Sequence, residues 1–147
     1  MKDNKGFTLI ELIVILGLAT IVMGAVMSFF IANYRSYNRL NTESELQYQS
    51  QYIINFMTDK ILEAEKYEED GKYKFYVDDN WIYFWRDGDS LIFEDDDNPG
   101  EKAIGDNISK FNVSSIGSNE VKIDLKLEKH EVEVGASQTV FMRNSQE

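Results

Sequence analysis

The chain has 147 residues, no cysteine and a net charge of −11. From residue 33 onward it carries 24 acidic and 13 basic side chains, an excess that repels nucleic-acid backbones and anionic lipid headgroups. We therefore expect no nucleic-acid binding by this chain alone. Without cysteine there is no disulfide staple, so the part after residue 32 must be held together by its own hydrophobic core.

The N-terminus combines a short charged segment, the hexamer Gly-Phe-Thr-Leu-Ile-Glu at residues 6–11, and a long apolar run. The run from Leu12 to Ala32 has 21 uncharged residues and as a helix spans about 31 Å, close to one hydrocarbon core. Because Lys2 and Lys5 precede it, we expect the first residues to stay in the cytoplasm and the bulk of the chain to lie outside. Glu11, at the edge of this span, costs roughly 1 to 3 kcal/mol if it is left unpaired, and it therefore needs a partner.

The hexamer and the run together closely resemble the leader of type IV prepilins and pseudopilins. The resemblance implies that a membrane peptidase cuts after Gly6 and that the same enzyme methylates the new terminal amine of Phe7. It also implies that Glu11 pairs with the terminal amine of a neighbouring subunit, an attraction of ~4 kcal/mol for unit charges about 4 Å apart at an effective dielectric of 20. An ordinary secretory signal has a shorter apolar core with a small-residue cleavage site after it, which disfavours that alternative.

Residues 34–67 contain no proline or glycine and predict that the helix continues past the apolar run, with Gly71 as its stop signal. Apolar residues recur there at spacings of three, four and seven. They are Leu46, Ile53, Met57, Ile61 and Ala64. This stripe needs a sheet to cover it.

The remainder predicts strands. Alternating residues at 73–77 and 81–85, then Leu91 and Phe93, with turn residues between them, predict a three-stranded antiparallel meander. Residues 110–116 and the clean alternation at 121–128 predict a second group. The apolar phase shifts by Val132, which predicts a turn or bulge around Lys129-His130, and residues 139–142 suggest a last strand.

These patterns predict an α+β, pilin-like fold, in which a long N-terminal helix, transmembrane in its first half, packs on an antiparallel β-sheet head. We expect a leader peptide at residues 1–6, the transmembrane half of the helix at 7–32, and an extracytoplasmic head at 33–147 that includes the amphipathic half of the helix. The segment Thr139 to Asn144 is similar to the ending of J-type minor pseudopilins and PilW-like minor pilins, which favours a minor subunit.

Two features resemble catalytic or metal sites. Gly88-Asp89-Ser90-Leu91 spells the nucleophile motif of a hydrolase family, but the only histidine, His130, lacks an aspartate three residues before it. We therefore expect no enzyme and no catalytic residue. His130 has no second histidine or cysteine to complete a transition-metal site, so we expect no metal and no cofactor.

Two further stretches leave alternatives open. The acidic run Glu94 to Glu101 offers oxygen ligands for calcium but lacks alternating ligand spacing, which favours a solvated loop turned by Asn98-Pro99-Gly100. Trp81, Tyr83 and Trp85 lie on one side of a predicted strand. They form either an exposed surface for a carbohydrate or protein partner or part of the core, and the core interpretation is favoured.

The resemblance implies a minor pilin or pseudopilin, a structural subunit anchored by its helix in the bacterial inner membrane, with its head outside. Assembly would place it in a type IV pilus or a type II secretion-like pseudopilus, in initiation or at the tip; DNA-uptake machines use the same leader. Its partners would be other major and minor pilins or pseudopilins, the prepilin peptidase and methylase, and the inner-membrane assembly platform. The alternative is a membrane-anchored binding or sensor domain that does not polymerise.

Overall fold

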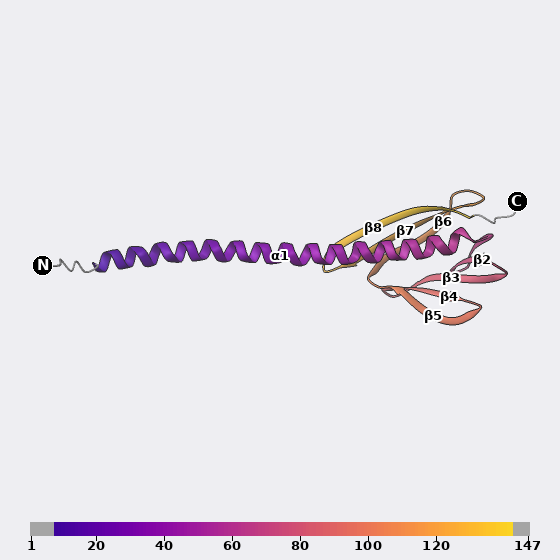
Figure 1. Cartoon of the computed structure of the whole chain (residues 1–147), viewed down its shortest axis with the longest axis horizontal. Coiled ribbons are helices and arrows are strands. Elements are labelled where there is room, and N and C mark those ends of the chain that lie inside the picture. The colour runs from indigo at the N-terminus through magenta and orange to yellow at the C-terminus, as the bar shows by residue number, and fades with distance from the viewer. Residues whose placement is uncertain (1–7, 143–147) are drawn as a thin grey trace. The chain divides into compact units, whose positions relative to one another are not determined.

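The computed structural model describes residues 8–142 (Figure 1). In this range a helix, α1 (Leu9–Leu62), is followed by eight strands. The strands are β1 (Lys66–Glu69), β2 (Tyr73–Val77), β3 (Asn80–Asp87), β4 (Ser90–Asp95), β5 (Asn98–Gly105), β6 (Ile108–Ser115), β7 (Glu120–Lys129) and β8 (Val132–Phe141). By their internal contacts the residues form two units, Met1–Leu40 and Asn41–Glu147.

In the first unit, the described residues 9–40 are all helical and all exposed. Phe29 and Phe30, for example, are each 70% exposed. By length and composition, α1 meets the requirements for crossing a membrane. This part of the chain therefore presents its apolar side chains outward instead of packing them into a core of its own.

In the second unit, the remainder of α1 buries one face. The buried side chains of the helix are Leu46, Ser50, Ile53, Ile54, Met57 and Ile61. This confirms the predicted stripe, and Ala64, just past the helix, is buried as well. The helix ends at Leu62 and not near Tyr67, because the chain turns there and the Glu65 N–H donates to the Tyr76 carbonyl at 2.8 Å.

The first sheet has five antiparallel strands in the order β1-β2-β3-β4-β5. It contains the predicted meander and adds β1 and β5 at its two edges. Gly71, with φ 70°, therefore belongs to the turn between β1 and β2 and does not stop the helix. The β2–β3 turn is made by Asp78 and Asp79, both at positive φ (47° and 65°), as a tight hairpin with the right-handed twist of its strands requires.

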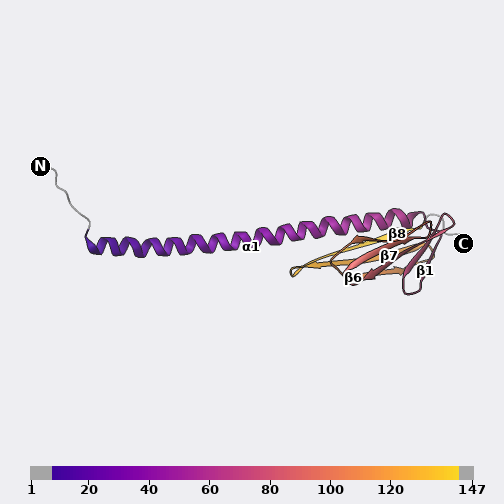
Figure 2. The ribbon, with the colours of Figure 1, turned by 90° about the horizontal axis from the view of Figure 1, so that it is seen from below.

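The second sheet has three antiparallel strands in the order β6-β7-β8. The turn between β7 and β8 consists of His130 and Glu131, at φ 48° and 64°, which confirms the predicted turn. Residues 132–141 form one continuous strand, so the predicted last strand is the end of β8 and not a separate element. Figure 2 shows β6, β7 and β8 beside the last part of α1.

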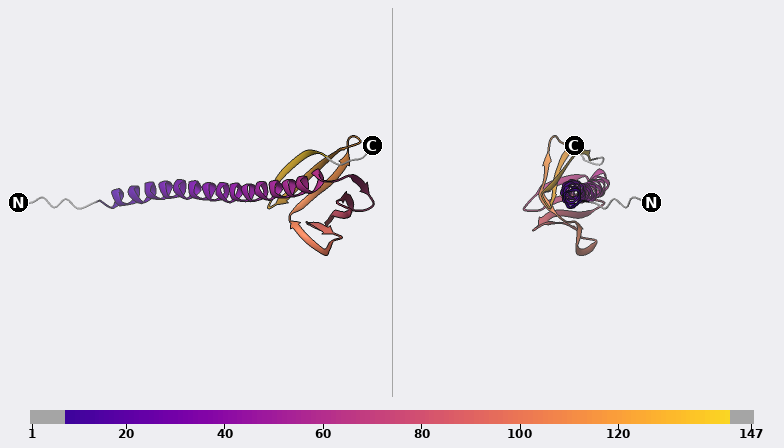
Figure 3. Two further views of the ribbon diagram at one scale, coloured as in Figure 1. Left: turned by 45° about the vertical axis from the view of Figure 1, so that its right-hand side comes forward. Right: turned by 90° about the vertical axis from the view of Figure 1, so that its left-hand side faces the viewer.

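Both sheets share one core with the second half of α1. The core cluster includes Ile53 and Met57 of the helix, Phe75 and Phe84 of the first sheet, and Leu125 of the second. Figure 3 shows strands of the two sheets passing on different sides of this half of the helix. The predicted α+β fold, with a long N-terminal helix packed against antiparallel sheets, is thus confirmed.

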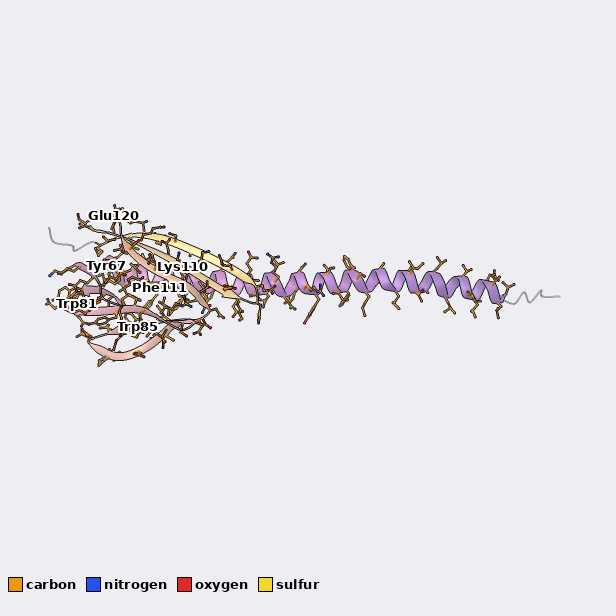
Figure 4. The ribbon with its side chains drawn as sticks, turned by 180° about the vertical axis from the view of Figure 1, so that it is seen from behind. Tyr67, Trp81, Trp85, Lys110, Phe111 and Glu120 are labelled. Carbon is orange, nitrogen blue, oxygen red and sulfur yellow. The ribbon has the colours of Figure 1, made fainter. Side chains whose placement is uncertain are left out.

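Side chains also join the two sheets directly. The Tyr67 hydroxyl of β1 donates to the Val113 carbonyl of β6 at 3.1 Å, and the Tyr73 hydroxyl of β2 donates to Asn112 Oδ1 at 3.3 Å. Figure 4 shows Tyr67 and Phe111 at this junction. At the other end of the junction, Arg86 Nη1 donates a hydrogen bond of 2.7 Å to the Ser109 carbonyl. The edge of β6 is therefore held by polar contacts from the first sheet.

Candidate functional site

The first turn of α1 is closed by a reciprocal pair of side chains. The Thr8 carbonyl accepts a hydrogen bond from the Leu12 N–H at 3.2 Å, which makes Thr8 the N-cap residue. Glu11 Oε2 accepts hydrogen bonds from the Thr8 N–H and the Thr8 hydroxyl, both at 3.0 Å. In return, the Glu11 N–H donates to Thr8 Oγ1 at 3.4 Å. This is a capping box, which satisfies donors that a helix N-terminus otherwise leaves free.

Glu11 is thus hydrogen-bonded within its own chain. The sequence interpretation sought its partner on a neighbouring subunit and overlooked Thr8, although the spacing Thr-x-x-Glu was a recognisable signal for a capping box. The carboxylate is exposed, so the contact with Thr8 leaves it accessible to a second partner. The other two predicted site residues, Gly6 and Phe7, lie outside the described residues.

The polar groups of the apolar run are also satisfied inside the helix. The Thr20 hydroxyl donates to the Gly17 carbonyl at 2.7 Å, and the Ser28 hydroxyl donates to the Gly24 carbonyl at 2.9 Å. Such bonds to the preceding turn allow hydroxyls to enter hydrocarbon without an unpaired donor. Apart from the adjacent backbone of the helix itself, a Cβ added at Gly17 or Gly24 would meet no described atom within 4 Å, so these positions lie open on the helix surface.

Three aromatic residues of β3, Trp81, Tyr83 and Trp85, do not belong to the core cluster, so the favoured interpretation of them is wrong. They are half-buried on the outer face of the first sheet, because Ile82 and Phe84 take the inner face. Figure 4 labels Trp81 and Trp85 on this sheet. The predicted alternation was correct, but both of its phases are apolar, and the sequence did not show which phase faces the helix.

Lysines lie over the outer aromatic rings. Lys72 Nζ is 3.4 Å from the Trp85 ring centroid and 3.2 Å from Glu94 Oε2, and Lys74 Nζ is 5.6 Å from the Trp81 ring centroid. A cation over an aromatic face is attracted by the ring quadrupole. The rings are therefore partly covered by the chain's own ammonium groups, which disfavours the interpretation as an open stacking platform for carbohydrate.

The acidic run at residues 94–101 is a hairpin and not a loop turned by Asn98-Pro99-Gly100. Asp95 pairs with Asn98 across the hairpin, so Asp96 and Asp97 make the turn, and Pro99 and Gly100 lie in the edge strand β5. Proline is tolerated there because an edge strand has unpaired N–H positions.

The carboxylates of this run have separate partners. Asp95 accepts from the Asn80 amide and Asp96 from the Tyr83 hydroxyl at 3.1 Å, while Glu94 pairs with Lys72. Among residues 8–142 no group of three His, Cys, Asp or Glu side chains is arranged to hold a metal ion.

The hydrolase-like motif lies in a hairpin between β3 and β4. Gly88 has φ 58° and makes the turn, while the Ser90 hydroxyl donates to Asp106 Oδ1 at 2.8 Å. His130 is exposed in a different turn, between β7 and β8. Neither arrangement supplies a serine that is hydrogen-bonded to a histidine base, which nucleophilic catalysis of this type requires.

One comparison with known proteins gives a match. Residues 1–27 match the prokaryotic N-terminal methylation motif. No curated protein and no solved structure matches the chain. The motif therefore covers the hexamer and most of the apolar run, including the capping box at Thr8 and Glu11, and does not extend into the second unit.

Proposed function

We propose that this chain, which carries the N-terminal methylation motif at residues 1–27, is a type IV pilin-like protein and, within that class, a minor pilin or pseudopilin. The motif implies processing by prepilin peptidase and assembly with pilins. The observation that carries the proposal is the motif on a helix whose apolar side chains all remain exposed through residue 32. Such a surface requires lipid before assembly and the helices of other subunits after it.

In the proposed sequence of events, the leader at residues 1–6 is removed between Gly6 and Phe7, and Phe7 is N-methylated. Residues 7–32 hold the subunit in the inner membrane, with the head at 33–147 outside. Anchoring of this kind before assembly is consistent with the apolar helix and the motif. The proteins of the pilin family are structural and generally not enzymes.

A minor role is favoured over a major one by the head. It is strand-rich, acidic and without cysteine, and the ending from Thr139 is similar to that of J-type and PilW-like subunits. Arg143 and Asn144 of that ending lie outside the described residues. We propose a place in initiation or at the tip of a type IV pilus or of a type II secretion-like pseudopilus, where few copies are needed.

Glu11 has a specific part in this proposal. Its exposed carboxylate would pair with the methylated amine of a neighbouring subunit and so set the register between two helices that otherwise slide in lipid. Because Glu11 also belongs to the capping box, a simple deletion of the side chain would remove two interactions at once. The test needs variants that separate charge from capping.

Three variants make this separation. Glu11→Gln keeps a residue that completes a capping box but removes the charge. Thr8→Val keeps the charge but removes the hydroxyl half of the box, and Glu11→Val removes the charge together with the carboxylate half. We expect all three to be cleaved and inserted, with filament incorporation strongly reduced in both Glu11 variants and retained in Thr8→Val. Incorporation is measured by immunoblotting of sheared filaments against the membrane fraction. Normal incorporation of Glu11→Gln would contradict the charge-pairing role.

Mass spectrometry of the protein from its native membrane tests the proposal as a whole. We expect a chain that begins at Phe7 and carries an N-methyl group. A chain with Met1 intact would contradict it and would favour a membrane-anchored binding or sensor domain that does not polymerise.

A further inference from the structure

The outer edge of β8 is long and regular, and no strand of the described part of the chain pairs with it. Within residues 8–142, β8 pairs only with β7, and the register runs without a shift from Val132, opposite Lys129, to Phe141, opposite Glu120. An edge of this kind presents free N–H and C=O groups that can pair with another strand.

The hydrogen-bond pattern shows which residues present these groups. The Met142 N–H donates to the Asn119 carbonyl at 2.8 Å, next to the pair Glu120–Phe141. Antiparallel pairs alternate between bonded and non-bonded, so the even-numbered residues of β8 bond to β7. The odd-numbered ones direct their N–H and C=O groups away from it: Glu133, Gly135, Ser137, Thr139 and Phe141. The Thr139 carbonyl takes a hydrogen bond from the Gln138 side-chain amide at 3.1 Å.

The other three sheet edges are protected. Strand β1 has only four residues, of which Lys66, Glu68 and Glu69 are charged. Strand β5 contains Pro99, and its register with β4 shifts. The edge of β6 receives Tyr67 and Arg86 from the first sheet. Charge, proline, irregularity and cover are the usual means by which proteins prevent strand addition, and β8 has none of them along most of its length.

The composition of β8 differs from that of the rest of the head. From Val134 to Met142 the sequence is Val-Gly-Ala-Ser-Gln-Thr-Val-Phe-Met, without a charge, in a chain of which 28% is charged. At the end of this stretch Phe141 is 60% exposed and Ile116 is 55% exposed. Both flank Glu120, since Ile116 N–H donates to the Glu120 carbonyl and Phe141 is its partner on the other side. Figure 4 places Glu120 at this end of the second sheet.

We infer that the outer edge of β8 receives an extended strand from a neighbouring pilin-like subunit and extends the three-stranded sheet by one strand. This inference rests on the proposed function, because it names a surface through which that assembly occurs. Backbone groups of the odd-numbered residues from 135 to 141 would supply the affinity, as in other cases of strand addition. The partner segment is uncharged along its length and has an apolar side chain that meets Phe141.

A different chain fits this edge better than a second copy. Two copies would bring together two heads that each carry a large negative charge, and such self-repulsion opposes association. An uncharged edge selects its partner by backbone pairing and by the apolar end at Phe141, and it places no charge opposite the incoming strand. Binding of a second copy is one outcome of the test below, and it would overturn the inference.

The test uses photo-crosslinking in cells that assemble the filament. The full chain carries a benzophenone amino acid at Ser137, Thr139 or Phe141, with Lys110 on the protected side of the same sheet and Tyr52 on α1 as controls. We expect the three edge positions to crosslink to one other pilin-like chain, and the crosslinked residue of that chain to move by two when the probe moves by two. This two-residue step is the signature of strand pairing, and simple proximity does not produce it.

A proline variant tests the backbone contribution. Thr139→Pro removes an N–H that β7 does not use, so the head should keep its fold while the crosslink from Phe141 falls at least tenfold. Thr139→Lys, which adds a charge at the edge and leaves the backbone intact, should also lower it. Tryptophan emission, which reports only the head, verifies folding of both variants.

Each remaining outcome has a defined meaning. Crosslinks from Tyr52 but none from the edge would show assembly without strand addition and would overturn this inference alone. Edge crosslinks that do not advance with the probe, or that reach only a second copy, would also overturn it. Absence of crosslinks from every position in correctly processed protein would overturn both this inference and the proposed assembly.

Discussion

The two units of this chain use apolar residues in opposite ways. In residues 9–40 apolar side chains cover the helix and all of them are exposed, whereas in residues 41–142 apolar side chains from one helix and two sheets bury one another. The first unit is therefore stabilised by its surroundings, whereas the second unit is stabilised by contacts within the chain. A substitution of the same chemical type should have very different effects in the two units.

The largest expected difference comes from one substitution made in both units. Phe84 is fully buried and contacts Phe56, Phe75 and Phe93, so Phe84→Ala should lower the free energy of unfolding of the head by about 3–5 kcal/mol. Phe29→Ala should change it by less than about 0.5 kcal/mol. Denaturant unfolding of the full chain in detergent, followed by the emission of Trp81 and Trp85, measures both. Equal effects would contradict the separation of the two units.

The next effect concerns the contact between helix and sheet inside the head. A Cβ at Gly105 of β5 would come within 2.9 Å of Ile53 Cγ1, and Ile53 is fully buried. Gly105→Ala should therefore cost about 1–3 kcal/mol through overpacking. Gly100→Ala in the same strand is the matched control, because a Cβ there meets nothing within 4 Å. The same unfolding measurement applies, and equal stability of the two variants would show that the helix yields at this contact.

A smaller, pH-dependent effect concerns the junction of the two sheets. Burial, reinforced by the charge of Glu69, raises the pKa of Tyr67 well above its ordinary value. The folded head therefore favours the neutral phenol, so this contribution to stability is complete below about pH 10 and is lost as the pH rises through the raised pKa.

Removing the Tyr67 hydroxyl tests this. Tyr67→Phe should lose about 0.5–1.5 kcal/mol at neutral pH, since the hydrogen bond to the Val113 carbonyl is removed. Above about pH 10 its stability should fall less steeply than that of the unmodified chain. Tyr76 and Tyr83, whose pKa values are also raised, are common to both proteins and cancel in the comparison. Identical slopes would exclude Tyr67 as a source of the pH dependence.

The smallest expected effect is a gain. Thr58 Oγ1 is buried and has no hydrogen-bond partner among the described residues. Thr58→Val keeps the shape and removes the unpaired hydroxyl, so the head should become more stable by roughly 0.5–1 kcal/mol. Thr58→Ser, which keeps the hydroxyl, should not. A loss of stability in Thr58→Val would mean that the hydroxyl has a partner in solution.

Sequence reasoning identified the parts of the fold that repeat a period. The stripe through Ile53 and Met57 and the alternation of β7 are long enough for their periodicity to distinguish a helix from a strand and to show which face is buried. It missed β1 and β5, because the charged Lys-Tyr-Glu-Glu and a stretch with Pro99 and Gly100 have low strand propensity. Both are strands because a neighbour in the sheet supplies hydrogen bonds, and such pairing is not encoded locally.

The same limit applied to the surface features. Strand β3 is apolar or aromatic on both faces, and only the packing against α1 determines which face is buried. The lysines over the aromatic rings come mainly from the neighbouring β2 and from the turn before it, so their cover depends on the register between strands.

Processing at Gly6 and Phe7 was inferred from motif resemblance, and it stays a prediction that the mass-spectrometric measurement tests.

The capping box at Thr8 and Glu11 affects the state of a subunit in the membrane before it is assembled. For a subunit held in the membrane as proposed, one carboxylate oxygen, Oε2, already has two donors from Thr8, so part of its hydrogen-bonding capacity is satisfied before assembly. Joining a filament then adds a charged partner to a side chain that Thr8 already holds in place. A stored subunit of this kind would keep its carboxylate ordered and ready for the incoming amine.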